Sequence, residues 1–255
     1  MKKAISYTLI FLGLQMLVST PVSIAIHLLE DHGILKSPSL NLLPMILASL
    51  VCIAVFVKAG WAIVSRNYLL TRPWGVLFWS ALAALGVVIP SIALQEQLPE
   101  LPNFMEQELG QLMSTRGGYF VVCLLVPLTE ELVFRGAVLR TLLSSSSFSP
   151  LAAIALSALF FALVHLNPAQ MPHAFLVGLL LGWMYWRTGS IIPGVTFHWV
   201  NNTVAYVLFK FYPDPDTRLV DIFGTGRNVA AAVIFSLFIL LPAIYQLSLR
   251  LKQPK

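Results

Sequence analysis

The amino-acid sequence predicts an all-α protein, a polytopic integral membrane bundle of about eight transmembrane helices around a buried polar cavity. Two observations lead to this fold class. Of the 255 residues, 58% are hydrophobic and only 11% are charged, whereas about 25% of the residues of a soluble domain are charged. Apolar runs of about 20 residues, the length of a helix that crosses a bilayer, recur along nearly the whole chain. The polar stretches between them leave no room for a separate soluble domain, so we expect a single membrane domain over residues 1–255.

The apolar runs define the predicted spans. The first run continues past Pro21 to about Leu29, which is long for a signal peptide and favours a retained helix. The stretch 95–116 between the third and fourth runs carries an apolar stripe and fits either a short interfacial helix or a solvated loop. In the sixth run, Gly178 and Gly182 would let a neighbouring helix approach closely. The predicted spans lie near residues 4–28, 40–64, 74–95, 118–142, 150–167, 170–187, 189–210 and 229–251.

The basic residues predict the orientation. They lie at the ends of the spans rather than on one face with interleaved aromatic residues, which argues against nucleic-acid binding. Lys and Arg favour cytoplasmic loops, and nine basic residues against five are cytoplasmic if both termini are inside. We therefore expect both termini in the cytoplasm and the bundle in a cell membrane, the inner membrane of a bacterium. The nine are Lys2, Lys3, Arg66, Arg72, Arg140, Arg187, Arg250, Lys252 and Lys255, and the five are Lys36, Arg116, Lys210, Arg218 and Arg227.

Ionisable side chains are costly in hydrocarbon, so those within predicted spans are candidates for function. The fourth span carries Glu130, Glu131 and Arg135 in an otherwise apolar sequence. At 100° per helical residue, Glu131 and Arg135 lie about 40° apart, while Glu130 points about 100° to the side of Glu131. We therefore expect Arg135 to neutralise Glu131 and to leave Glu130 free. An ion pair that only joins two helices would need one carboxylate, so Glu130 remains for another role.

Two further spans carry histidines. Phe161 and His165 are one turn apart near the end of the fifth span, and His198 and Asn202 are one turn apart in the seventh. A single histidine near a helix end is more often a hydrogen-bonded interfacial or core residue than a catalyst. Polar partners from other spans would favour a catalytic role, and the fold could bring Glu130, His165, His198 and Asn202 to one point.

Such a cluster has the groups needed for attack by water on an amide. A carboxylate in low dielectric beside a histidine can take a proton from water, and a second histidine and an amide can donate hydrogen bonds to the oxyanion. Two His and one Glu are also a zinc ligand set with an open position, although the helical His-Glu-x-x-His signature is absent. We expect no cofactor, with zinc bound by His165 and His198 as the open alternative. A Cys123 nucleophile has a weak case, because a buried thiol without a cationic neighbour is usually inert.

Three motifs in order resemble the CAAX protease and bacteriocin-processing family of membrane proteins, also called CPBP or Abi-type. Any one motif alone would be weak, whereas all three in this order and in apolar surroundings make the match specific. The resemblance covers roughly residues 118–210, which would be the catalytic core. The motifs are Glu130-Glu131-x-x-x-Arg135, Phe161-x-x-x-His165 and His198-x-x-x-Asn202.

The resemblance implies both a fold and residue roles. It implies an all-helical bundle whose conical cavity holds the site. Glu130, with His165, would activate the attacking water, while His198 and Asn202 would stabilise the oxyanion. The remaining motif residues, Glu131 and Arg135, would support the site.

The function predicted from these residues is that of a CAAX-protease-like intramembrane endopeptidase. It would hydrolyse a peptide bond of a membrane-associated or lipidated peptide or protein, with a glutamate-activated water, so its partners are that substrate and the lipid bilayer. A non-catalytic bacteriocin-immunity or scaffold protein of the same fold is the alternative, which the complete catalytic set disfavours because a scaffold has little reason to bury a spare carboxylate. A proton-coupled transporter would usually show internal repeats or broken helices, and the sequence shows no matching half.

Overall fold

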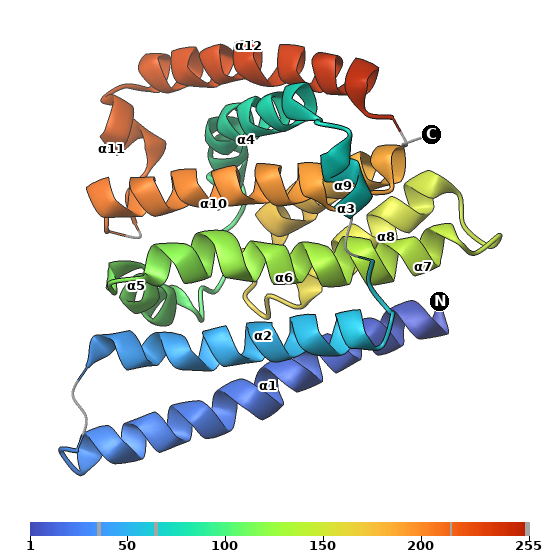
Figure 1. Cartoon of the computed structure of the whole chain (residues 1–255). Coiled ribbons are helices and arrows are strands. Elements are labelled where there is room, and N and C mark those ends of the chain that lie inside the picture. Colours follow the sequence, from blue (N-terminus) through green and yellow to red (C-terminus); the bar gives the residue numbers. More distant parts are fainter. Residues whose placement is uncertain (35–36, 64–65, 215, 253–255) are drawn as a thin grey trace.

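A computed structural model describes residues 1–34, 37–63, 66–214 and 216–252 (Figure 1). Helices make up 79% of the structure, and the described residues contain no strand, so the predicted all-α class is confirmed. Lys36 and Lys255, two basic residues used to predict the orientation, lie outside the described residues, as do the side chain of Arg66 and the predicted end of the second span at residue 64. The elements are α1 (Lys2–Asp31), η1 (Pro38–Leu42), α2 (Leu43–Lys58), α3 (Arg66–Leu70), α4 (Trp74–Gln95), α5 (Glu106–Ser114), η2 (Phe120–Leu125), α6 (Val126–Val133), η3 (Phe134–Leu139), α7 (Arg140–Leu143), α8 (Pro150–Leu163), α9 (Met171–Thr188), α10 (Ile192–Phe211), α11 (Leu219–Phe223) and α12 (Gly226–Arg250).

Four of the described helices are long and apolar enough to cross a membrane. They are α1, the run Pro38–Lys58 that joins η1 to α2, α4 and α12, and they coincide with the first, second, third and eighth predicted spans. The fourth to seventh predicted spans are also helical but fall outside this class. At 1.5 Å per residue, the 14 residues of α8 reach about 21 Å, less than the ~30 Å hydrocarbon core. The structure thus provides four candidate spans, and the count of eight stays a prediction.

The helices form a layered bundle (Figure 1). The antiparallel pair α1 and α2 packs along one side of the continuous helical run from η2 to α7. On the other side of that run lies α10, while α8 and α9 form a hairpin behind it, and α4 packs between α10 and α12. The segments that carry the three sequence motifs, α6, the end of α8 and α10, are therefore held together in the middle of the molecule.

Close approach between helices depends on glycines at two places. A Cβ atom at Gly86 of α4 would lie 2.6 Å from the backbone nitrogen of Leu240 in α12. Between α8 and α9, a Cβ at Gly182 would lie 2.9 Å from Ile154 Cγ2, and one at Gly178 would lie 3.0 Å from the Cβ of Ala158. The predicted close approach at the Gly-x-x-x-Gly pair is therefore present, and its partner is α8.

Residues 106–114, within the polar stretch after the third span, form helix α5, so a short helix and not a loop is found there. Its apolar side chains Leu109, Leu112 and Met113 line a cavity. Phe104, which precedes the helix, is 71% exposed. The apolar stripe seen in the sequence is therefore divided between this cavity and the exposed surface.

Two π-helical turns flank the glutamates of α6. Single π turns inside α-helices are frequent at functional sites. In η2 the N–H of Val126 donates to the carbonyl of Val121, five residues earlier. The next bond in that register would join residue 127 to Val122, but residue 127 is Pro127, which has no N–H. The π-helical ladder therefore ends at this proline and leaves the Val122 carbonyl free for a side chain.

The long apolar helices, together with the sequence motifs, identify an integral membrane protein.

Candidate functional site

All four residues of the predicted catalytic set line one cavity of about 450 Å³. Glu130 comes from α6, His165 from the turn that follows α8, and His198 and Asn202 from α10. The rest of the wall is largely apolar and comes from α2, α4, α5, η2 and α9, with further side chains from α6 and α10. Its apolar side chains include Met45, Val88, Ile92, Met105, Leu109, Leu112, Met113, Val122, Val126, Val177 and Leu208.

The pair Glu131–Arg135 lies fully buried beside this cavity. Oε1 of Glu131 accepts a hydrogen bond from Nη1 of Arg135 at 2.8 Å, and both side chains are 0% exposed. Nη2 of Arg135 also donates to the carbonyl of Gly178 at 3.2 Å, and the guanidinium carbon lies 4.5 Å from the ring centroid of Phe161. The guanidinium therefore joins α6, α8 and α9, and the contact that the helical angles predict between these two side chains is present.

His198 lies between the two adjacent carboxylates. Its Nδ1 donates to Oε1 of Glu131 at 3.3 Å, and its Nε2 lies 3.6 Å from Oε2 of Glu130. The Glu130 side chain is 14% exposed, so its carboxylate borders the cavity, whereas that of Glu131 is enclosed. Sequence reasoning gave Glu131 a single partner, because angles within one helix say nothing about contacts with another. The structure adds His198 as a second partner, so Glu131 also fixes the direction of that ring.

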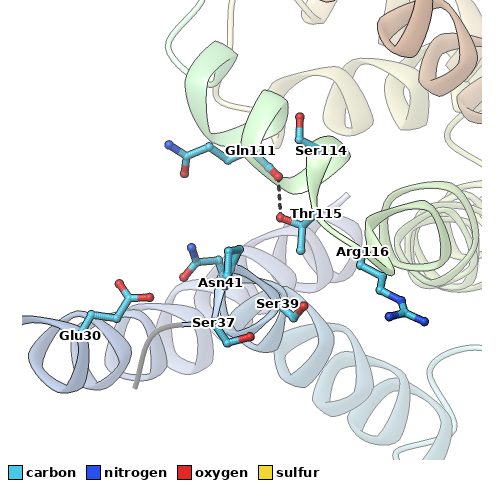
Figure 2. Close-up of a pocket in the computed structure, with 9 residues that line it drawn as sticks. Glu30, Ser37, Ser39, Asn41, Gln111, Ser114, Thr115 and Arg116 are labelled. Carbon is cyan, nitrogen blue, oxygen red and sulfur yellow. Dashed lines mark hydrogen bonds between the residues drawn. The ribbon is translucent and has the colours of Figure 1, made fainter. Parts of the chain in front are cut away.

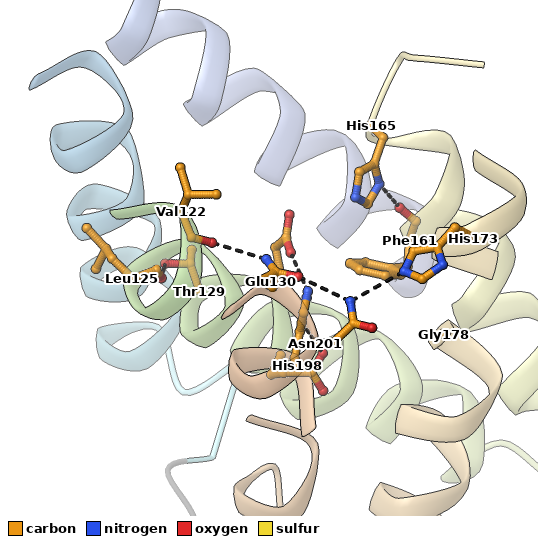
Figure 3. A network of polar contacts seen from close by, with 12 residues as sticks. Val122, Leu125, Thr129, Glu130, Phe161, His165, His173, Gly178, His198 and Asn201 are labelled. Carbon is orange, nitrogen blue, oxygen red and sulfur yellow. Dashed lines mark hydrogen bonds and ion pairs between the residues drawn. The ribbon is translucent and has the colours of Figure 1, made fainter. Parts of the chain in front are cut away.

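His165 lies beyond the end of its helix. The helix α8 ends at Leu163, four residues before the predicted end. The ring Nδ1 of His165 donates to the carbonyl of Phe161 at 2.8 Å, which leaves Nε2 as the nitrogen with an acceptor lone pair. The ring of Phe161 stands edge-on to it, with 4.9 Å between centroids. Figure 3 shows His165 at the margin of the polar group, and among the contacts of the described residues none joins it directly to Glu130.

The turn that carries His165 is held by a buried asparagine. Leu166 has a φ of 51°, in the left-handed region that is uncommon for residues other than glycine. Asn167 is 0% exposed. Its Nδ2 donates to Oδ1 of Asn103 at 2.8 Å, and its Oδ1 accepts from the backbone N–H of Phe104 at 3.0 Å. These two bonds attach the turn to the segment before α5 and so set where His165 enters the cavity.

Asn202 is anchored by the carbonyl that Pro127 leaves free. Nδ2 of Asn202 donates to the carbonyl of Val122 at 3.1 Å. The thiol of Cys123 bonds to the backbone carbonyl of Asn202 at 3.4 Å. Cys123 is thus a packing residue between η2 and α10, in agreement with the weak case for it as a nucleophile.

Sequence reasoning missed two polar residues of the same cavity, His173 and Asn201. His173 lies in the first turn of α9, and Asn201 precedes Asn202 in α10. Nδ2 of Asn201 lies 3.3 Å from Nε2 of His173 and 3.4 Å from Oδ1 of Asn202, as the dashed lines of Figure 3 show in part. Both residues lie within predicted spans, so the rule that polar residues in spans are functional candidates would have identified them.

Among the described residues, no group of three His, Cys, Asp or Glu converges on a point that could hold a metal ion. The guanidinium of Arg135 already supplies the positive charge beside Glu131.

A second, wider cleft of about 980 Å³ lies at the end of α1 and near α5 (Figure 2). Its polar side chains include Glu30, Asn41 and Arg116, and Thr115 donates to the carbonyl of Gln111 at 2.7 Å. No histidine is among the described residues that line it. The groups suited to hydrolysis are in the smaller cavity.

Comparison with known protein families gives a match over the segment that carries the candidate site. Residues 114–204 match the family described as type II CAAX prenyl endopeptidase, Rce1-like. The matched segment runs from the end of α5 into α10 and holds all three sequence motifs. No curated protein and no solved structure matches the chain significantly. Through this central segment, the chain is similar to the Rce1-like family of the CAAX-protease (CPBP) type.

Proposed function

We propose that the protein is an intramembrane endopeptidase that cleaves a membrane-associated or lipidated substrate with a water activated by Glu130. The observation that carries the proposal is the cavity itself, in which the Glu130 carboxylate faces His198 and shares its walls with His165 and Asn202. A carboxylate with nearby imidazoles and an amide donor can catalyse the attack of water on an amide, with the carboxylate as general base. The family match of residues 114–204 supports the same class of activity.

In the proposed reaction, Glu130 takes a proton from water as the oxygen bonds to the carbonyl carbon of the substrate. Its partner in this step is His165, which lines the same cavity. The carbonyl π-electrons move to oxygen and give a tetrahedral oxyanion. When the C–N bond breaks, the proton held by Glu130 passes to the leaving amine, so the carboxylate is regenerated and the balance closes with one water consumed.

Asn202 and His198 stabilise the oxyanion in this proposal. Asn202 has one Nδ2 hydrogen bonded to the Val122 carbonyl and a second available to the substrate. His198 can donate from Nε2 when both ring nitrogens carry hydrogen, and its Nδ1 is held by Glu131. Glu131 and Arg135 have no contact with the substrate; they hold His198 and the helices in place.

The proposal also covers the membrane, the orientation of the chain, cofactors and partners. We place the protein in the cell membrane, the inner membrane of a bacterium, with both termini in the cytoplasm and about eight spans, which include the four long apolar helices. No resident metal or other cofactor takes part, because Glu130 and the histidines supply the base and the donors. The lipid bilayer and a membrane-associated peptide or protein are its partners.

Cleavage of defined peptides tests the proposal. Purified protein in lipid vesicles is offered a library of lipidated and plain membrane peptides, and products are identified by mass spectrometry. Glu130→Gln should lower cleavage by ~10²-fold or more, while Glu100→Gln, an exposed carboxylate outside the cavity, should cleave normally. Cleavage that survives Glu130→Gln would refute the role of Glu130. Absence of products with every peptide would favour a non-catalytic immunity or scaffold protein.

A further inference from the structure

We infer that His173 and Asn201 form a positioning relay that fixes the side-chain amide of Asn202 in the orientation needed to donate to the oxyanion. The inference rests on the proposed function, because it assigns a task to two residues outside the three family motifs. It starts from a chain of polar contacts that joins three helical segments, η2, α10 and α9. The contacts run from Val122 to Asn202, from Asn202 to Asn201 and from Asn201 to His173.

The polarity of this relay is set at one end by a backbone carbonyl. A carbonyl oxygen can only accept, so the atom of Asn202 that lies 3.1 Å from Val122 O must be Nδ2. The other terminal atom of Asn202, which faces Asn201 at 3.4 Å, is then the oxygen Oδ1. An oxygen needs a donor opposite it, so Asn201 presents its Nδ2 there. Turning the Asn201 amide around would place two oxygens at that distance.

The same logic fixes the hydrogen on His173. Nδ2 of Asn201 also lies 3.3 Å from Nε2 of His173. Since that Nδ2 is a donor, Nε2 of His173 must accept, and the ring hydrogen is on Nδ1. One backbone carbonyl in η2 thus determines the tautomer of a histidine in α9 through two side-chain amides.

Burial makes the relay restrictive. Asn201 is only 6% exposed, and its Oδ1 has no hydrogen-bond partner among the described residues. Its orientation therefore comes from Nδ2 alone, whose two hydrogens serve His173 and Asn202. Without the acceptor on His173, only the contact with Oδ1 of Asn202 would oppose reversal of the Asn201 amide.

The consequence falls on Asn202. Its amide is held at both ends, since Nδ2 donates to Val122 and Oδ1 accepts from Asn201. This leaves one N–H of fixed direction, which is the property of a preorganised oxyanion donor. If Asn201 released Oδ1, the Asn202 amide would be held only by the Val122 carbonyl, so the direction of its free N–H would be less fixed and the barrier would rise.

Kinetic variants test the relay with a readout that packing alone would not change. Loss of a whole oxyanion donor costs about 10²–10³-fold in kcat, so loss of its support should cost about 10-fold. We expect Asn201→Leu and His173→Leu to lower kcat by about that factor with little change in KM. His173→Gln, which offers an amide oxygen as acceptor, should recover most of the lost rate. In an Asn202→Ala background, the same two Leu substitutions should have no further effect, because the residue through which they act is gone.

The outcomes separate this inference from the proposed function. If Asn202→Ala lowers kcat while Asn201→Leu and His173→Leu are normal, or if their effects multiply in the Asn202→Ala background, the relay is wrong and the proposed function stands. If Glu130→Gln and Asn202→Ala both cleave normally, the proposed function itself is wrong.

A spectroscopic measurement applies even without a substrate. In protein labelled with ¹⁵N-histidine, His173 should show a hydrogen on Nδ1 and an acceptor-type Nε2 at neutral pH, with its signals assigned by their loss in His173→Gln. Asn201→Leu should shift the Nε2 signal. A hydrogen found on Nε2 would overturn the relay.

Discussion

Replacement of Glu131 by Gln should destabilise the protein strongly, because it leaves Arg135 as a buried cation without its hydrogen-bonded carboxylate. Both side chains are 0% exposed and their charged atoms are 2.8 Å apart. Removing one member of a buried pair costs ~3–5 kcal/mol. An independent figure agrees, since two unit charges ~4 Å apart at an effective dielectric of ~20 interact by ~4 kcal/mol. The hydrogen bond from Arg135 to the Gly178 carbonyl remains, but it supplies no opposite charge.

Glu130→Gln is the matched control, because it makes the same change one residue earlier. The Glu130 side chain is partly exposed to the cavity, and its contact with Nε2 of His198 is 3.6 Å, which is longer than a hydrogen bond. We expect its free energy of unfolding to change by at most ~1 kcal/mol, while cleavage falls by ~10²-fold or more. Glu131→Gln should therefore mainly lower stability, whereas Glu130→Gln should mainly lower activity.

Unfolding of the purified variants in one detergent, together with cleavage per folded molecule, measures both effects. A double variant, Glu131→Gln with Arg135→Met, should regain most of the stability lost in Glu131→Gln, since it removes the unpaired cation. Equal stability of Glu131→Gln and the unsubstituted protein would show that the pair is not the buried anchor described above. A destabilised Glu130→Gln with an active Glu131→Gln would reverse the two assignments.

Three further predictions concern metal, orientation and packing. Cleavage should persist in excess chelator, and one equivalent of zinc lost together with activity would contradict the metal-free mechanism. Reporters fused at the C-terminal end and near Asp216 should report opposite sides of the membrane, with the C-terminus inside, and a shared side would remove an odd number of spans. Gly194→Ala should destabilise by ~1–3 kcal/mol, because its methyl group would lie 2.7 Å from Oε2 of Glu131, whereas Gly13→Ala, which has nothing within 4 Å, should not destabilise.

Contacts within one helix were predictable from the sequence. The pairing of Glu131 with Arg135 follows from an interval of four residues on a helix, and the structure contains it. The all-α class and four of the spans follow from apolar length and composition. These features need no knowledge of which helices are neighbours.

Contacts between helices were not predictable in the same way. The bond from His198 to Glu131 depends on how α10 crosses α6, which a single sequence does not specify. The early end of α8 at Leu163 is another example, because Pro168 limits where a helix must stop but not where tertiary contacts end it sooner. His173 was overlooked because it lies in none of the three motifs, although it lines the same cavity.

The lack of a backbone N–H at Pro127 affects how α10 packs against η2. A residue with an N–H at this position could donate to the Val122 carbonyl within the same helix. That hydrogen bond would compete with the one from Nδ2 of Asn202. The imino acid removes that competitor and reserves the carbonyl for α10. Pro127 takes no part in proton transfer, but because it lacks an N–H it helps to determine how α10 is rotated about its axis relative to η2.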